Sequence, residues 1–148
     1  MSKQKNYEHN NFMNIEDYTL ITRHTVMASD LNMHNNLYGG ILLNWLDEAG
    51  YIFAVETCKF SNLVTVALNN VAFKSPVKLG DIIEIYAKLN KIGRTSISIK
   101  LFAQNISVCH NCQPRPIIDC DIVFVRVDKK GKPQLIKKTK EKNYECQC

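Results

Sequence analysis

The stretch that decides the fold is residues 30–49, DLNMHNNLYGGILLNWLDEA. After the double glycine, Gly39 and Gly40, apolar side chains recur at steps of three and four, which places them on one face of a helix. This pattern predicts one long helix that continues to about Thr57. The segment before it, residues 28–38, is rich in Asn, Asp and Ser and is typical of an irregular loop.

The remaining runs of apolar and β-branched residues predict strands, one before the helix and four after it. They are residues 18–27, 62–73, 81–89, 95–104 and 117–127. Because helices do not alternate with these strands, a parallel doubly wound sheet is excluded, and an α+β fold with an antiparallel sheet packed on one helix is favoured. The chain divides into a polar leader (1–16), one globular domain (17–133) and a basic tail that contains cysteines (134–148).

Composition indicates a globular chain, since 45% of its 148 residues are apolar and 22% are charged. The net charge of +5 suggests a partner with negative charge. However, the whole excess lies in residues 129–148, and residues 1–128 are neutral overall, so a nucleic-acid-binding face is not indicated. No apolar run reaches the ~18 residues of a membrane span. We therefore expect a cytoplasmic protein with no membrane partner and with reduced thiols.

The cysteine pattern leaves alternatives open. Cys109 and Cys112 form one C-x-x-C, Cys120 follows, and Cys146 and Cys148 stand at the end of the chain. A hairpin loop with free thiols is favoured. A zinc site, or a redox role for the C-x-x-C, is the alternative, although zinc needs about four ligands at suitable spacing.

The helix start is the most informative place for chemistry. The first N–H groups of a helix lack partners within the helix and carry partial positive charge, and glycine lets another group come close to them. Gly39 and Gly40 thus suit a carbonyl oxygen that becomes an oxyanion, or simply form a tight turn. Asp47 lies about two turns after Gly40, on the same face, and is either functional or an ordinary salt-bridge partner. Its neighbour Glu48 faces elsewhere.

Other polar residues carry weaker signals. His34 lies in the loop with no Ser or Cys nucleophile related to it, and is most simply a surface residue. Lys74, Lys78 and Arg94 stand at strand ends and turns, where most basic side chains are solvated but where an anionic ligand could also be bound.

Three blocks of the sequence resemble hotdog-fold acyl-CoA thioester hydrolases, in particular the short bacterial enzymes related to the brain-type acyl-CoA hydrolase. They are NNLYGGILLNWLDEAG (35–50), VTVALNNVAFKSPVKLGDIIEIYAKLNKIGRTSISI (64–99) and FVRVDKKGKP (124–133). The resemblance covers about residues 18–133. It implies a curved antiparallel sheet wrapped around the long helix, pairing of two copies into one continuous sheet, and assembly of three pairs into a hexamer.

The resemblance also implies roles for particular residues in a site at the dimer interface. Asp47 is the expected catalytic carboxylate, Asn36 the polar residue that precedes the double glycine, and the Gly40 N–H the oxyanion donor. The turn Arg94, Thr95 and Ser96 is expected near the nucleotide of CoA. Gly39 and Lys74 are also expected to bind the substrate, because of their places at the helix start and at a strand end. One departure is Asn35, where many members have glycine; asparagine tolerates the positive φ that this position implies.

The function implied is hydrolysis of acyl-CoA to a free fatty acid and CoA, without a metal or cofactor. Asp47 acts either as a general base on water or as a nucleophile that forms a transient anhydride. The alternative is an acyl-CoA-binding hotdog protein without catalysis. A hotdog dehydratase would need a histidine paired with a carboxylate, for which His34 is poorly placed, and a zinc-stabilised basic binding module is a more distant alternative.

Overall fold

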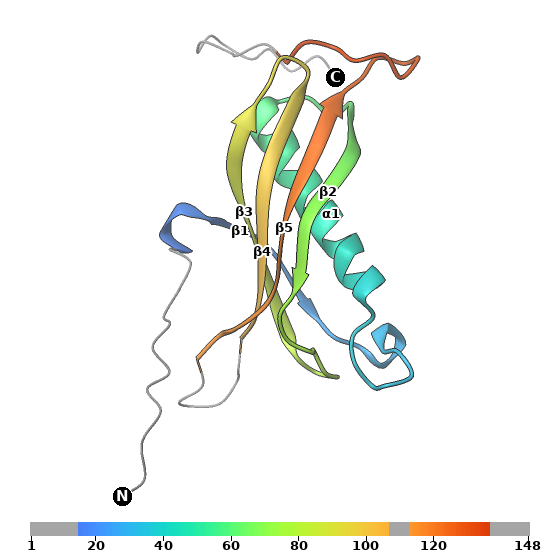
Figure 1. The fold of residues 1–148 in the computed structure, drawn as a ribbon, viewed down its shortest axis with the longest axis vertical. Helices are drawn as coiled ribbons and strands as arrows, with labels where there is room; N and C mark the ends of the chain where they lie inside the picture. Colours follow the sequence, from blue (N-terminus) through green and yellow to red (C-terminus); the bar gives the residue numbers. More distant parts are fainter. Residues whose placement is uncertain (1–14, 107–112, 137–148) are drawn as a thin grey trace, which may run out of the picture.

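The computed structural model describes residues 15–106 and 113–136, which form one long helix and five strands (Figure 1). Two short 3-10 helices, Ile15–Asp17 and Ala28–Asp30, flank the first strand and were not predicted. The predicted helix and all five predicted strands are confirmed. Their bounds are Thr19–Thr25 (β1), Gly39–Cys58 (α1), Leu63–Phe73 (β2), Ile82–Ile92 (β3), Ser96–Ile106 (β4) and Arg115–Arg126 (β5).

The five strands form one antiparallel sheet in the order β1-β3-β4-β5-β2, so that β1 and β2 are its edges. The sheet curves around α1, which lies across one of its faces (Figure 1). This is the α+β arrangement that the resemblance implies. Among the described residues, no helix is long and apolar enough to cross a membrane.

The core lies between α1 and the sheet. Along the central strands every second side chain faces the helix, as the pleat requires. Gly50 marks the closest approach of the helix, because a Cβ atom there would lie 3.1 Å from Ile122 and 3.3 Å from Phe124. The buried side chains of this layer include Leu42, Leu46, Ala49, Ile83, Ile85, Ile97, Ile99, Leu101, Ile122 and Phe124. The apolar periodicity that predicted these elements is therefore the pattern of one shared core.

The predicted end of the domain at residue 133 lies within a hydrogen-bonded segment. The backbone N–H of Gln134 donates to Arg126, that of Ile136 donates to Arg94, and the Ile136 side chain is buried, so the packed unit continues past 133. The rest of the predicted tail and the C-x-x-C lie outside the described residues. The last predicted strand, 117–127, needs one correction, since Arg115 and Pro116 also belong to β5.

Candidate functional site

A compact loop, residues 26–38, leads into α1 and is organised by Asn32. The side-chain Oδ1 of Asn32 accepts from the backbone N–H of His34 at 2.9 Å and of Asn36 at 3.3 Å. The Asn32 N–H donates to the Asn36 carbonyl at 2.8 Å. Asn35 has a φ of 55°, which confirms that asparagine adopts the left-handed conformation here. These bonds fix the position of Asn36 just before the helix.

The helix begins with two backbone donors that have no partner in the described structure. Tyr38 caps the helix with its carbonyl, which accepts from Ile41 and Leu42 at 3.1 Å each, and its own side chain makes no capping bond. No backbone carbonyl among the described residues accepts from Gly39 or Gly40. Such free N–H groups at a helix start, together with the helix dipole, attract an anionic oxygen.

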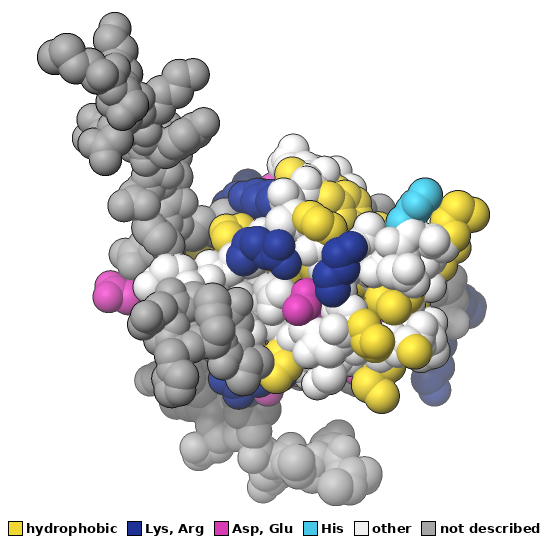
Figure 2. Space-filling model, turned by 90° about the horizontal axis from the view of Figure 1, so that it is seen from below, with side chains coloured by type: hydrophobic (Ala, Val, Ile, Leu, Met, Phe, Trp, Pro, Cys, Tyr) yellow, Lys and Arg dark blue, Asp and Glu magenta, His cyan; other side chains and the backbone are white. Residues whose placement is uncertain are grey.

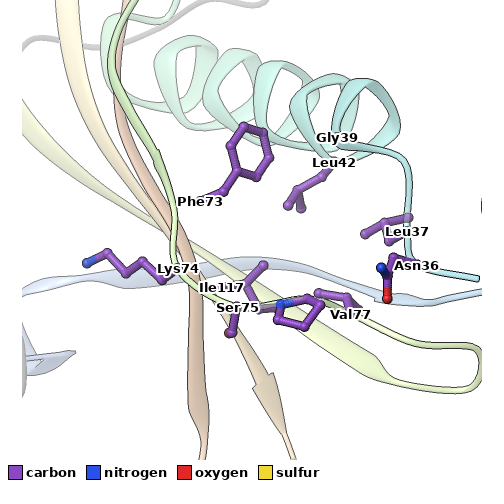
Figure 3. A pocket seen from close by; sticks show the side chains of 10 residues that line it. Asn36, Leu37, Gly39, Leu42, Phe73, Lys74, Ser75, Val77 and Ile117 are labelled. Atoms are coloured by element: carbon purple, nitrogen blue, oxygen red, sulfur yellow. The ribbon is translucent and has the colours of Figure 1, made fainter. Parts of the chain in front are cut away.

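An open pocket of about 450 Å³ lies at this helix start, between α1 and the end of β2 (Figure 3). Asn36 lines it, and its Oδ1 is buried with no hydrogen-bond partner among the described residues. The other lining residues are mostly apolar and come from the loop, α1, the end of β2 and β5: Leu37, Gly39, Leu42, Phe73, Lys74, Ser75, Pro76, Val77 and Ile117. The pocket therefore offers an apolar volume with a few polar groups, which is typical of a small-molecule site.

The Lys74 backbone belongs to this pocket, but its ammonium group does not. Figure 3 shows the side chain directed away from the cavity. Its Nζ forms an ion pair with Asp119, on the face of the sheet opposite α1. Figure 2 views the molecule from the end where α1 begins, and Lys and Arg side chains lie there among apolar and polar ones. The structure thus gives Lys74 an acidic partner in place of a free position for a ligand.

Asp47 lies on the flank of α1 that faces β2. Thr65, the third residue of β2, donates its Oγ1 hydrogen to Asp47 Oδ1 at 2.6 Å. Thr65 pairs with Phe124, whose side chain is in the core, so this part of the edge strand directs a hydroxyl toward the helix. Sequence reasoning missed Thr65; the only signal was that it is the one hydroxyl residue in this strand. Glu48, which was predicted to face elsewhere, is exposed.

The predicted site residues fall into three places in one copy of the chain. Asn36 and Gly39 line the pocket, and Gly40 follows directly in the first turn of the helix but is not among the lining residues. Asp47 is seven residues further along the helix, which is about 10 Å from Gly40 along its axis. Arg94 and Thr95 lie in the turn between β3 and β4, and Ser96 begins β4, at the end of the sheet where α1 finishes. The carbonyls of all three accept backbone hydrogen bonds there. One copy alone does not bring these groups together.

Residues 34–106 match the family described as the Thioesterase superfamily. The acyl-CoA thioester hydrolase YciA of Salmonella typhimurium is 32% identical over 117 residues, which are 78% of this chain and 87% of that protein. The chain belongs to the thioesterase superfamily. Its fold matches the hexameric hotdog-fold thioesterase Cj0915 of Campylobacter jejuni with a TM-score of 0.73 and 32% identity, covering 80% of this chain and 90% of that one. The predicted hotdog fold is thereby confirmed.

A further superfamily structure is the acyl-CoA hydrolase of Staphylococcus aureus, solved in complex with butyryl-CoA, CoA and CoA disulfide. It has a TM-score of 0.72 and 26% identity, and the match covers 82% of this chain and 72% of that one. Structures of that enzyme also exist with one aspartate or one asparagine replaced by alanine. The two replaced residues are 15 positions apart in its sequence.

In this member of the superfamily, β2 is an edge strand with an apolar exposed surface. Only β5 pairs with β2, so the backbone groups along its other side have no strand partner in the described structure. Large apolar side chains of this strand are exposed, and 55% of the surface of Val66 is accessible to solvent. The others are Val64, Leu68, Val71 and Phe73. An edge of this kind is suited to pairing with another strand.

The titratable groups with shifted pKa values lie away from the pocket. Burial alone raises the pKa of Glu84, but hydrogen bonds from Tyr86, Gln104 and Arg23 lower it overall. Burial and Glu84 raise the pKa of Tyr86 to about 12. Burial lowers the pKa of His24, which stacks on a tryptophan ring. No group of three or more metal-ligating side chains occurs among the described residues.

Proposed function

We propose that the protein hydrolyses acyl-CoA thioesters to a free carboxylic acid and CoA. The observation that carries this proposal is the start of α1, where the N–H groups of Gly39 and Gly40 have no partner among the described residues and Gly39 lines a mostly apolar pocket beside Asn36. Asp47, held by Thr65 on the flank of the same helix, supplies the carboxylate that such a reaction needs. Membership of the thioesterase superfamily supports the same activity.

In the proposed reaction, the thioester carbonyl oxygen accepts a hydrogen bond from the Gly40 N–H. That bond strengthens as the oxygen becomes an oxyanion, so it stabilises the transition state. Asp47 acts as a general base. Thr65 occupies its Oδ1 and leaves Oδ2 to take a proton from the attacking water. The tetrahedral intermediate then breaks the C–S bond, and the proton on Asp47 passes to the departing thiolate. The chemistry requires no metal or cofactor.

The site forms between two copies of the chain. In one copy, Asp47 and Gly40 are about 10 Å apart along the helix axis, which is too far for one reacting carbon to meet both. If two β2 edges pair antiparallel about a two-fold axis, the start of each strand lies beside the end of the other. Thr65 and Asp47 of one copy then approach Phe73 and Gly39 of its partner.

The same pairing explains why the Arg94 turn is so far from the pocket in one copy. That turn lies near the start of β2, and pairing places the start of β2 beside the pocket of the second copy. Arg94, Thr95 and Ser96 are there available to the nucleotide part of CoA. A homodimer is thus the smallest active unit. Assembly of three dimers follows the hexameric structure of the Campylobacter jejuni relative.

Two asparagines in the loop have distinguishable roles. Asn32 stands 15 positions before Asp47, the spacing of the two residues replaced in the Staphylococcus aureus hydrolase, whereas Asn36 has the buried, unpartnered oxygen in the pocket. We expect Asn36→Ala to lower kcat about tenfold with an unchanged melting temperature, because its Oδ1 supports no other group in the loop. We expect Asn32→Ala to lower both kcat and the melting temperature, since two backbone N–H groups lose their acceptor.

The control for this pair is Asn32→Asp, which keeps an acceptor oxygen and should recover the melting temperature. The kcat and the melting temperature of the three variants, measured by thiol release and thermal unfolding, distinguish the two roles. Full kcat in Asn36→Ala, together with a large loss of kcat in both Asn32 variants, would assign the orienting role to Asn32 alone.

Free-thiol release from acyl-CoA substrates is the direct test of the proposed function. Purified protein should release CoA thiol from butyryl-CoA and from longer acyl-CoAs at rates well above buffer. Binding of acyl-CoA without thiol release, measured by calorimetry on the same preparation, would instead establish a non-catalytic acyl-CoA-binding protein.

A further inference from the structure

One residue of the pocket wall has a large apolar side chain that is exposed. Phe73 is the last residue of β2, and 56% of its surface is exposed although it carries a large apolar ring. The ring lies over the cavity between the end of the strand and the first turn of α1 (Figure 3). The ring therefore borders the open, apolar volume of the pocket as well as the free edge of β2 that is proposed to pair with a second copy.

The ring is held from both sides. Its backbone is fixed, since Phe73 pairs with Ile118 in the ladder and the next residue, Lys74, donates its N–H to Ile117 at 2.7 Å. On the helix side, a Cβ atom at Gly39 would lie 3.3 Å from Phe73 Cζ and 3.4 Å from Cε1. Glycine at the helix start therefore also makes room for this ring. The ring and Gly39, the first residue of the helix, are therefore immediate neighbours.

This arrangement bears on the substrate under the function proposed above, on which the inference rests. A carbonyl oxygen bound at the first turn of α1 places the adjoining acyl carbons in the apolar volume beside it. The walls of that volume are Leu37, Leu42, Phe73, Val77 and Ile117. Of these side chains, Phe73 is the exposed one, and the other four are buried in the protein. Phe73 is therefore the lining residue whose side chain can be truncated without leaving a cavity in the core.

We infer that Phe73 is a specificity-determining residue that limits the length of the acyl group. The ring closes the apolar pocket at the helix start, so short straight-chain acyl groups fit and longer ones meet the ring. Removing the ring lengthens the pocket. Each further methylene that is then buried raises kcat/KM about fourfold.

The test compares kcat/KM for butyryl-, hexanoyl-, octanoyl- and decanoyl-CoA in the wild type, Phe73→Ala and Phe73→Leu. The ratio of octanoyl- to butyryl-CoA should rise at least about tenfold in Phe73→Ala and by a smaller factor in Phe73→Leu. The matched control is Leu79→Ala, an exposed apolar residue outside the pocket lining, whose chain-length profile should equal that of the wild type.

Two outcomes overturn the inference: an unchanged chain-length profile in Phe73→Ala, or an equal loss for every substrate. The second would mean that the ring only supports the structure, and Phe73→Leu serves if the alanine variant does not fold. Failure of the proposed function is recognised separately, because the wild type would then release no thiol. In that case, the role of Phe73 is tested by acyl-CoA dissociation constants measured on the same variants. These constants should show the same shift in preference toward longer chains.

Discussion

Asp47→Asn is expected to reduce kcat for acyl-CoA hydrolysis by about 10³-fold, within the range of a lost general base. The amide keeps the size of the carboxylate and can still accept the hydrogen bond from Thr65 through its oxygen, so packing between α1 and β2 is retained. The measurement is thiol release under saturating substrate, together with thermal unfolding and calorimetric titration of CoA. Both the melting temperature and the affinity for CoA should remain near those of the wild type.

The matched control for this prediction is Glu48→Gln. Glu48 is the next residue in the same helix turn, but its side chain is exposed, so removal of its charge should leave kcat within about twofold. Near-normal turnover in Asp47→Asn, or an equal loss in both variants, would contradict the role assigned to Asp47. Incorporation of oxygen from labelled water into Asp47 during a single turnover would show attack by the carboxylate itself in place of general-base catalysis.

Gly40→Pro is the second variant for which a large effect is expected. Proline removes the one backbone N–H that is proposed to bind the oxyanion, and the first turn of a helix tolerates it because that N–H has no acceptor within the helix. Loss of one oxyanion donor costs about 10²- to 10³-fold in kcat. Thiol release should therefore fall by that factor, whereas circular dichroism should show an intact helix.

Gly40→Ala is the control for the proline variant. It keeps the N–H, and the space around a Cβ atom at this position is open, so kcat should stay within about twofold of the wild type. A similar loss in both variants would show that glycine is needed for its size, and would place the oxyanion donor elsewhere.

The sequence predicted the elements well because their periodicity reports burial directly. The apolar residues that follow Gly40 at steps of three and four form the face of α1 that packs on the sheet, and the alternating runs form β3, β4 and β5. The start of the helix was predictable because the double glycine separates the polar loop from the first apolar residues of the helix. Asn35 also adopts the backbone conformation expected of it.

The geometry of the site was less predictable because it depends on contacts between distant segments. The bond from Thr65 to Asp47 requires knowledge of which residues of β2 face the helix, and two register shifts in that strand prevent a simple count. The ion pair of Lys74 with Asp119 depends on the same register. The separation of the Arg94 turn from the pocket follows from the direction of each strand in the sheet. None of these is encoded in local spacing.

The shared site is tested most directly by mixing two inactive variants, Asp47→Asn and Gly40→Pro, by co-refolding in equal amounts. If each site takes Asp47 from one copy and Gly40 from the other, half of the dimers are mixed and each mixed dimer holds one intact site. The preparation should then regain about a quarter of wild-type activity, as two-fold symmetry requires. Activity no higher than that of the two variants measured separately, in a preparation shown to contain mixed dimers, would contradict a site built from two copies.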